Sequence, residues 1–434
     1  DGSSKFAKDH RYAFFPSVSA AWRISEENFW QPLKGWWNDM KIRGSYGSLG
    51  NQVMDDLGNF PYLATYGTNS SYNYLINGSK PVIVKAPGLV APDFTWETVT
   101  QMDFGFDASF LNNRLTGTFD WYRRNTKDML VAGATLPATL GASVPKSNSA
   151  DMKTIGWELS LGWNDRLENG FSYWVKGVLS DYQATITKYA GNDAGFYSQS
   201  DGDGKYYVGQ KIGEIWGYHS NGLFQSDDEA ATIDQSELYA GKWGAGDVKY
   251  EDLDNDGTIT KGEETIYNPG DKSIIGNKTP RYQFGITVGF DYKNFDFEMF
   301  WQGTGKRDYM LSGAQFWGFT SQWDVPYTPA LDYWTETNTD AYFPRPGWQN
   351  GGNRVTSDRY LQSAAYGRLK NLTVGYTIPK NLTTKWGISR LRLYVTGENL
   401  LTITPLNDAF DPETLGGMTY PINRKVAIGL NLTL

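Results

Sequence analysis

The stretch that decides the fold is residues 281–304, which read RYQFGITVGFDYKNFDFEMFWQGT. Large apolar or aromatic side chains stand at every second position from Tyr282 to Tyr292, and Gln, Gly, Thr and Asp fill the positions between them. A period of two places alternate side chains on opposite faces of a β-strand. Little more than Lys293 separates this segment from a second one at 294–304, so the pair predicts two long antiparallel strands joined by a tight turn.

The same alternation recurs along the chain and predicts an all-β protein. It is clearest at the C-terminus, where Val426, Ile428, Leu430, Leu432 and Leu434 alternate with small or polar residues. Helical periodicity over more than three turns is absent. Many of the segments reach the length of about 9–11 residues that a membrane-spanning strand needs, whereas soluble strands average about 5–6. We expect eleven strands, at roughly 12–24, 39–49, 95–110, 113–126, 151–164, 171–185, 281–292, 294–304, 366–378, 390–402 and 424–434.

The predicted connections alternate between short and long. The short ones are 25–38, Leu111-Asn112, 165–170, Lys293 and 379–389, and the longer ones are 50–94, 127–150, 186–280, 305–365 and 403–423. Outer-membrane β-barrels have short periplasmic turns and long extracellular loops in this way. A soluble sandwich does not place its long loops at every second connection, and no propeller repeat of about 40–50 residues is visible. The pattern therefore favours an antiparallel transmembrane β-barrel.

Composition narrows the possible functions. The 434 residues hold 40 Lys and Arg against 48 Asp and Glu, and a formal charge of −8 argues against nucleic acid as a partner. The lack of cysteine excludes disulfides, thiolate metal sites and Cys nucleophiles. The two histidines, His10 and His219, exclude a multi-histidine zinc site, and both are expected to be ordinary loop residues. Aromatic content of 15% with a mean hydropathy of −0.51 suits a wet β-structure with aromatic girdles.

The chain is expected to be a piece of a longer protein. It begins at Asp1 without a Met or a signal peptide, and no run of 18 apolar residues predicts a transmembrane helix. A strand in lipid cannot leave its backbone groups unpaired, so eleven strands with two open edges need further strands from the same polypeptide or from a partner fragment.

Short motifs over the whole chain carry a family resemblance. They are FPSVSAAWRIS at 15–25, KIRGSYG at 41–47, GNQ at 50–52, WETVTQ at 96–101, LNNRL at 111–115, GQKIG at 209–213, IIGN at 274–277 and GENL at 397–400. In this order they resemble the C-terminal half of the barrel of SusC/RagA-type TonB-dependent transporters of Bacteroidota.

The resemblance implies a 22-stranded outer-membrane barrel, of which residues 1–434 hold the last eleven strands, with the long loops outside and lipid around it. The N-terminal plug domain, the N-terminal half of the barrel and the segment that contacts TonB are missing from this chain. The resemblance further implies a SusD-like surface lipoprotein as partner. It implies import of oligosaccharide or peptide without enzymatic chemistry.

One motif points to a metal ion. Residues 252–263 read DLDNDGTITKGE and match an EF-hand calcium loop, with carboxylates at positions 1, 3 and 5 and Gly257 at position 6. We predict that calcium is bound by Asp252, Asp254, Asp256, the Thr258 carbonyl and Glu263, and that it rigidifies the 186–280 loop. A merely solvated turn is the alternative. The shorter DGDG at 201–204 lacks the twelfth-position carboxylate and is interpreted as a turn.

The 305–365 loop is rich in aromatic residues. Its tryptophans are Trp317, Trp323, Trp334 and Trp348. Aromatic faces stack on sugar rings and also form protein interfaces. We therefore predict substrate or lid contact for these four, with packing of the loop as the alternative.

The strands themselves predict a polar inner and an aromatic outer face. The acids Asp103, Asp107, Asp120, Glu158, Asp291 and Glu298 are expected to line a solvated lumen. Trp22, Trp121, Tyr122, Trp157, Trp163, Tyr292, Trp301 and Tyr376 are expected in outer aromatic girdles. Two other interpretations stay open: a soluble or surface-anchored glycan-binding module with a calcium-clamped loop, and a secreted glycosidase, which needs a carboxylate pair that nothing here places across a cleft.

Overall fold

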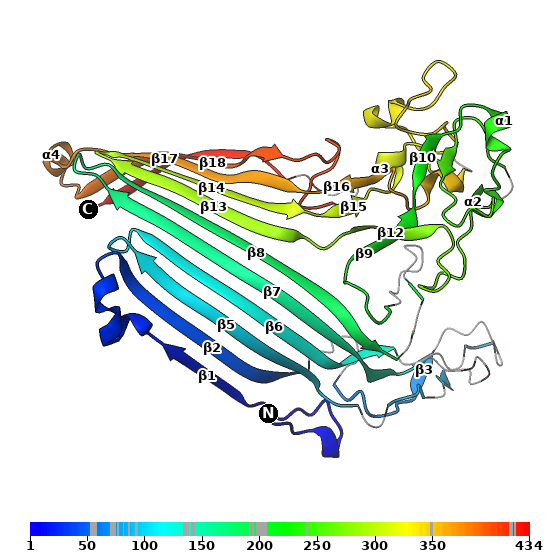
Figure 1. The fold of residues 1–434 in the computed structure, drawn as a ribbon, viewed down its shortest axis with the longest axis horizontal. Helices are drawn as coiled ribbons and strands as arrows, with labels where there is room; N and C mark the ends of the chain where they lie inside the picture. The colour runs from blue at the N-terminus through cyan, green and yellow to red at the C-terminus, as the bar shows by residue number, and fades with distance from the viewer. Residues whose placement is uncertain are drawn as a thin grey trace.

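The main feature of the computed structural model is one curved antiparallel sheet (Figure 1). The structure describes residues 1–434 except 53–58, 70–74, 76–77, 81, 86, 92–93, 133–136, 138, 140–143, 191, 193–194, 197–205, 240–241, 348–349, 416–419 and 421. Eleven strands form the sheet, in the order β1 (Ser17–Trp22), β2 (Trp37–Asn51), β5 (Glu97–Phe110), β6 (Leu115–Ala132), β7 (Lys146–Arg166), β8 (Ser172–Tyr189), β13 (Arg281–Tyr292), β14 (Phe295–Lys306), β17 (Tyr366–Thr377), β18 (Arg390–Ile403) and β19 (Lys425–Thr433).

These strands are the eleven that the apolar alternation predicts, so the all-β antiparallel prediction is confirmed. The predicted ends differ in places. The first strand covers only Ser17–Trp22 instead of 12–24, because Pro16 precedes it and lacks the backbone N–H that a paired strand needs. β6 and β7 extend further toward their shared long connection than predicted. On β6 a register shift at Asp128, which has φ +56°, breaks the alternation before Met129-Leu130-Val131, and on β7 the added residues 146–150 are mainly polar.

Smaller elements lie in the connections. Two-stranded sheets are β3 (Gly67–Asn69) with β4 (Ile83–Lys85), β9 (Glu214–Tyr218) with β12 (Lys272–Asn277), β10 (Ser220–Leu223) with β11 (Val248–Tyr250), and β15 (Asp308–Met310) with β16 (Leu361–Ser363). The helices are η1 (Lys8–His10), η2 (Ile24–Glu26), η3 (Asn28–Leu33), α1 (Asp227–Ala230), α2 (Ser236–Tyr239), α3 (Ala314–Trp317), η5 (Thr328–Leu331), η6 (Gly351–Arg354), α4 (Lys380–Thr383) and η7 (Thr384–Trp386). Among the described residues, no helix has the length and hydrophobicity to cross a membrane.

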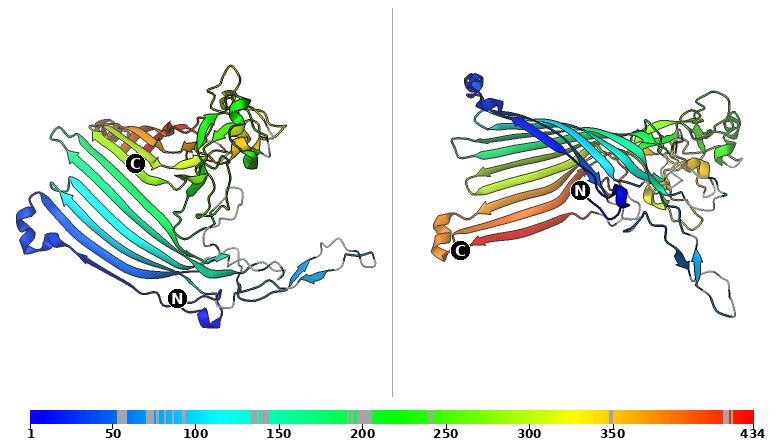
Figure 2. Two further views of the ribbon diagram at one scale, coloured as in Figure 1. Left: turned by 45° about the vertical axis from the view of Figure 1, so that its right-hand side comes forward. Right: turned by 90° about the horizontal axis from the view of Figure 1, so that it is seen from below.

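The connections between sheet strands separate by length to the two ends of the sheet. The short ones are 23–36, 111–114, 167–171, 293–294 and 378–389. The long ones are 52–96, 133–145, 190–280, 307–365 and 404–424. Because consecutive strands are antiparallel, all short connections lie at one end and all long ones at the other, as Figures 1 and 2 show. We call these the short-turn end and the long-loop end.

The two faces of the sheet have opposite chemistry. One register row runs through Ile42, Phe106, Phe119, Leu159, Leu179 and Phe284 on neighbouring strands. A second row, on the other face, runs through Arg43, Gly105, Asp120, Glu158, Ser180 and Gln283. The apolar side chains are largely exposed, as with Phe104 at 55% and Ile428 at 83%. Alternation of this kind gives a barrel its lipid-facing outer face and its polar inner face.

Three of the long loops fold together into one compact body, which we call the loop body (the described residues of 206–277, 308–364 and 404–415). Its buried core combines residues from all three loops, among them Tyr250, Phe316, Tyr360 and Phe410. Phe316 and Tyr360 lie in edge contact, with ring centroids 6.2 Å apart. Burial of this much apolar surface fixes the loops relative to one another.

A fully buried carboxylate, Asp247, joins two of these loops. Its oxygens accept hydrogen bonds from Arg345 Nε at 2.9 Å, Asn353 Nδ2 at 2.8 Å and the backbone N–H of Gly244 at 2.9 Å. Asp247 is 0% exposed, whereas the Arg345 side chain is 38% exposed. A buried charge that loses its partner is costly, so Asp247 and Arg345 hold the two loops in one arrangement.

The outer face generates a first prediction. Ile286→Arg places a charge in the middle of the outer face of β13 and is expected to destabilise the membrane-inserted protein by about 2–4 kcal/mol. Gln283 of the same strand points to the inner face and lies between Ser180 and Thr304, so Gln283→Arg is the control and is expected to be nearly neutral. The measurement is urea unfolding of the full-length protein in lipid vesicles. The folded fraction at each urea concentration is read from the heat-sensitive gel mobility of a folded barrel. Equal destabilisation by both variants would contradict the assignment of the faces.

The loop body generates a second prediction. Asp247→Asn leaves Arg345 without its carboxylate partner, and we expect about 2–4 kcal/mol less stability for the loop body, because the charge pair is lost and the amide turns an NH2 donor toward the guanidinium. Limited proteolysis of the full-length protein measures it: the loops are cut faster while the barrel keeps its heat-sensitive gel mobility. The control is Asp228→Asn on α1, an exposed acid. Unchanged cleavage of Asp247→Asn would show that the loops do not depend on this contact.

Candidate functional site

The inner face carries a network of paired charges. On β2, the Arg43 guanidinium lies 3.3 Å from Asp107 and donates to Asp120 Oδ2 at 2.6 Å. Ser45 Oγ donates to Asp103 at 2.9 Å. The predicted lumen acids of these strands thus share one face and are held by neighbours, which keeps the wall polar without leaving it strongly acidic.

A polar hollow of about 630 Å³ opens on the inner face near the short-turn end. Acidic and basic side chains line it together, among them Asp291 and Glu298, which are two of the predicted lumen acids, and Arg390. Arg392 pairs with Asp296 there and lies 4.8 Å from the ring centroid of Tyr394. This mixture of charges, amides and aromatic rings can bind polar, uncharged or zwitterionic groups.

One predicted girdle residue belongs to the inner face instead. Tyr122 pairs across the ladder with Asp103 and Gly156, and its ring covers Gly156 at a distance that leaves no room for a Cβ atom. The prediction for Tyr122 was wrong because Trp121 and Tyr122 are adjacent and only one of two adjacent strand residues can face outward. Trp121 and Trp157 are directly opposite each other on the outer face, as predicted.

The tryptophans of the 305–365 loop have different environments. Trp317 is 9% exposed and packs edge-on against Tyr360, with ring centroids 4.6 Å apart. Trp334 packs over Gly246 and is partly buried against the loop-body core. Trp323 is 83% exposed on the loop surface. Trp348 lies outside the described residues. Trp317 is therefore a core residue and Trp334 packs against the core, whereas Trp323 is the most exposed of the three described tryptophans.

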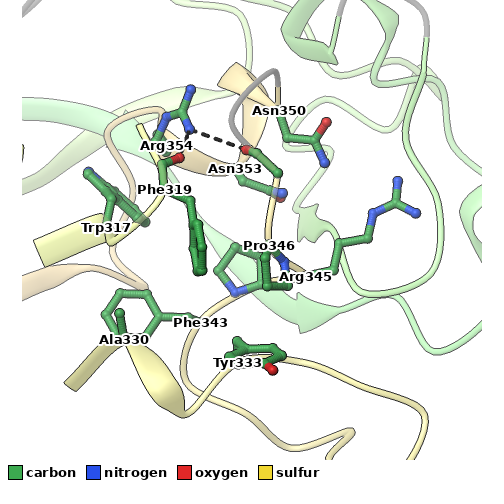
Figure 3. A pocket seen from close by; sticks show the side chains of 12 residues that line it. Trp317, Phe319, Ala330, Tyr333, Phe343, Arg345, Pro346, Asn350, Asn353 and Arg354 are labelled. Carbon is green, nitrogen blue, oxygen red and sulfur yellow. Dashed lines mark hydrogen bonds between the residues drawn. The ribbon is translucent and has the colours of Figure 1, made fainter. Parts of the chain in front are cut away.

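A small cavity adjoins Trp317 in the loop body (Figure 3). Phe319, Tyr333, Phe343 and Arg354 contribute to its lining, and Arg354 donates to the backbone carbonyl of Phe319 at 2.9 Å. Its volume of about 30 Å³ corresponds to roughly one water molecule. The cavity is too small for a sugar ring or a large peptide side chain.

The predicted calcium loop has the expected tight turn. Gly257 has φ +87°, and Asp252 accepts from the backbone N–H groups of Asn255 and Gly257, both at 2.7 Å. Asp256 accepts from Thr258 N–H at 2.7 Å. Burial by itself raises the pKa of Asp252, but the backbone N–H groups of Gly257, Asn255 and Asp256 together bring it below the ordinary carboxyl value.

The carboxylates that converge differ from the predicted set. Among the described residues, Asp252, Asp254 and Asp271 bring ligating oxygens within 4.8 Å of one another, while Glu263 is exposed and lies outside this group. Asp271 is 1% exposed and accepts from the backbone N–H groups of Leu253 and Thr260, each at 2.7 Å. Burial raises its pKa, and the charges of Asp254 and Asp252 raise it further. Nothing in the twelve-residue spacing could identify Asp271.

His219 is more than an ordinary loop residue. Its Nδ1 lies 2.7 Å from Asp358 Oδ2 and its Nε2 lies 2.7 Å from Ser273 Oγ. Asp358 also accepts from the backbone N–H of Ser220 at 2.9 Å. Through His219, these contacts join Ser273 on β12 to Asp358 in the 305–365 loop. The partners are 139 and 54 residues away, so no local motif could have indicated them.

The comparisons with known proteins agree with this architecture. The profile of the family described as "TonB dependent receptor-like, beta-barrel" matches residues 1–400. TonB-dependent receptor P3 of Formosa agariphila is 30% identical over 100% of this chain and 43% of its own length. TonB-dependent receptor SusC of Bacteroides thetaiotaomicron is 27% identical over 100% of this chain and 41% of its own length.

The structure of the RagAB peptide transporter superposes with a TM-score of 0.77 at 22% identity, covering 99% of this chain and 44% of that chain, which shows a shared fold. The chain thus spans less than half the length of the relatives it matches. These relatives are receptors and transporters and not enzymes, in agreement with the prediction of no catalysis. The chain belongs to the TonB-dependent receptor-like β-barrel family.

Proposed function

We propose that this chain is the second half of the barrel of an outer-membrane transporter that imports oligosaccharides or peptides in a TonB-dependent way. Its long loops lie outside the cell and a SusD-like surface lipoprotein is its partner. The plug and the TonB contact belong to the part of the protein that precedes these residues. The observation that supports this most is the sheet with an apolar outer face, a polar inner face and all its long loops at one end.

The open sheet edges support the same proposal. Among the described residues, β1 and β19 each pair with one strand only. Unpaired backbone groups are costly in lipid, so further strands are needed to close the barrel. A soluble glycan-binding module would have to cover the apolar face with other protein, yet Val426, Ile428 and Leu430 are all more than half exposed.

The substrate class is proposed from the relatives and from the site. SusC and the RagAB peptide transporter are similar to this chain in sequence or fold. The hollow with Asp291, Glu298 and Arg390 offers groups of both charges, which suits peptides, and its hydroxyl and amide neighbours suit sugars. Trp323, exposed on the loop body, is proposed to contact the substrate or the lipoprotein.

The third prediction tests this function in a strain whose full-length gene is deleted and complemented. Wild-type protein is expected to restore growth on some member of a panel of oligosaccharides and oligopeptides, and uncoupling from TonB is expected to abolish it. Trp323→Ala is expected to reduce uptake severalfold because a large aromatic contact is lost. Tyr267→Ala, at an equally exposed aromatic of another loop, is the control.

The Trp323→Ala variant distinguishes a contact with the lipoprotein from a contact with the substrate. Loss of lipoprotein co-purification identifies a partner contact, whereas a raised half-saturation concentration with intact co-purification identifies a substrate contact. Unchanged uptake by Trp323→Ala would exclude both. Failure of every substrate in the panel, with a correctly inserted barrel, would contradict the proposed nutrient class.

We further propose that calcium binds at the 252–271 loop and stabilises the loop body, with Asp252, Asp254 and Asp271 as its carboxylate ligands. The carbonyl of Thr258 and the carboxylate of Asp256 remain candidates from the loop pattern. Three acids with oxygens within 4.8 Å repel one another, and a divalent cation removes this repulsion. Oxygen-only donors of this kind suit calcium.

The fourth prediction is a loss of stability on calcium removal. At a calcium concentration a hundredfold above Kd, binding stabilises the folded loop body by about 2.7 kcal/mol, so chelation with EGTA is expected to lower its thermal transition and to speed proteolysis of residues 206–277. Asp271→Asn is expected to abolish the calcium effect. Glu263→Gln, at the twelfth loop position, is expected to preserve it. The reverse result for these two variants would restore the EF-hand ligand set.

A further inference from the structure

The outward side chains of the sheet differ in chemistry between the short-turn end and the long-loop end. At the short-turn end, the outward positions of the sheet are apolar or aromatic, as with Leu115, Trp163 and Tyr376. At the long-loop end, on β6 and β7, the outward positions become basic. Arg123 pairs with Met102 on one side and Ile155 on the other, so a guanidinium lies between two apolar side chains of the outer face.

Three cations meet at this place. Arg123, Asn125 and Lys127 are successive outward residues of β6, and Lys153 of β7 lies directly opposite Asn125. Directly paired residues are about 4.5–5.5 Å apart at Cα, and alternate residues of one strand are about 6.6 Å apart. The three positive side chains therefore surround Asn125 within the reach of one phosphate group. We call Arg123, Lys127 and Lys153 the basic triplet.

The acidic residues around the basic triplet have other partners. In the described part of the chain, none of the three forms an ion pair, and Arg123 Nε donates only to Asn125 Oδ1 at 3.3 Å. Asp151, the nearest acid on β7, accepts from the backbone N–H of Asp128 at 2.9 Å. Asp181, opposite Trp157, is 7% exposed and held by Arg281, with Nε to Oδ1 at 2.5 Å.

The surface on the membrane side of the triplet is suited to acyl chains. Trp121 is the outward-facing residue of β6 that precedes Arg123, toward the short-turn end. It stacks with Phe104 at a centroid distance of 6.4 Å, and Phe104 is 55% exposed. Ile155 beside Arg123 is 39% exposed. Hydroxyl groups lie level with Asn125, from Thr100 opposite Asn125 and Thr185 opposite Lys153, and on its loop side, from Thr98 opposite Lys127. A molecule that matches this surface has a phosphate, a polar head on the loop side and apolar chains on the other side.

We propose that Arg123, Lys127 and Lys153 bind the phosphate of an outer-leaflet lipid headgroup. Arg and Lys bind phosphate through charge-assisted hydrogen bonds, and cations placed at a membrane interface attract anionic headgroups. The assignment to the outer leaflet rests on the proposed position of the long loops outside the cell. The register of β5, β6 and β7 places the triplet on the same face as Trp121 and Trp157.

The test uses the full-length protein, purified in a non-ionic detergent and delipidated. Monophosphoryl lipid A is titrated and the lipid-bound fraction is measured by native mass spectrometry. Wild-type protein is expected to retain one lipid in preference to the dephosphorylated form. The triple variant R123Q/K127Q/K153Q is expected to bind this lipid about a hundredfold more weakly, because each of the three cations contributes to the affinity for the anionic phosphate.

The control is a triple variant of inner-face cations, K41Q/R124Q/K176Q, which removes the same charge without touching the outer face. It is expected to bind like wild type. Equal affinity of the wild type and the R123Q/K127Q/K153Q variant would overturn the proposal, as would equal retention of phosphorylated and dephosphorylated lipid.

Two further results separate other occupants and the proposed transport. Displacement of the lipid by millimolar inorganic phosphate would overturn a lipid site in favour of free phosphate, and capture of a second copy of the chain at the triplet in place of lipid would also overturn it. Uptake measured in the same variants distinguishes this proposal from the transport function: lost lipid binding with wild-type uptake supports the lipid site whatever the substrate.

Discussion

The pairing of backbone polar groups is the constraint on which this structure depends. In lipid no water can satisfy an N–H or C=O group, so every strand of the sheet needs neighbours along its whole length. The ladder from β1 to β19 meets this need for the nine strands in between, and its strict alternation then divides the side chains into two faces. The position of Ile286 outside and Thr287 inside, and the pairing of Arg43 with Asp120, follow from that division.

The sequence predicts the sheet well because its signal is local. A strand such as Arg281–Tyr292 shows its two faces within twelve residues, and the register follows from its turn at Lys293. The loop body is beyond such reasoning, because its contacts join distant segments: Asp247 meets Arg345, and His219 meets Asp358. The candidate site was predicted in part. The turn at Gly257 was expected. The carboxylate that converges with Asp252 and Asp254 is that of Asp271, which lies eight residues past the predicted loop.

The loop body gives the long connections a physical role. Loops without their own core move independently, but here residues from three connections share one apolar core with Tyr250 and Phe316 at its centre. Side chains that a sequence-based interpretation assigns to ligand binding, such as Trp317, serve this core instead. The body consequently presents a defined surface on which few large aromatics remain free, with Trp323 the most exposed of the described tryptophans. A partner that docks there meets a fixed shape and does not have to order the loops, which lowers the entropic cost of binding.

The two ends of the outer face provide an argument about orientation that is independent of loop length. At the short-turn end, Trp37 lies between Trp30 and Phe110, with centroid distances of 4.7 and 5.0 Å, and the rings fill the boundary between sheet and turn. At the other end, Arg123 interrupts the apolar row. An apolar boundary tolerates zwitterionic or neutral headgroups, whereas a cation in an apolar row is stable only when its head reaches water or an anion. On β6 and β7 the outer face is therefore chemically polarised along the strands, and its cations lie at the end with the long loops.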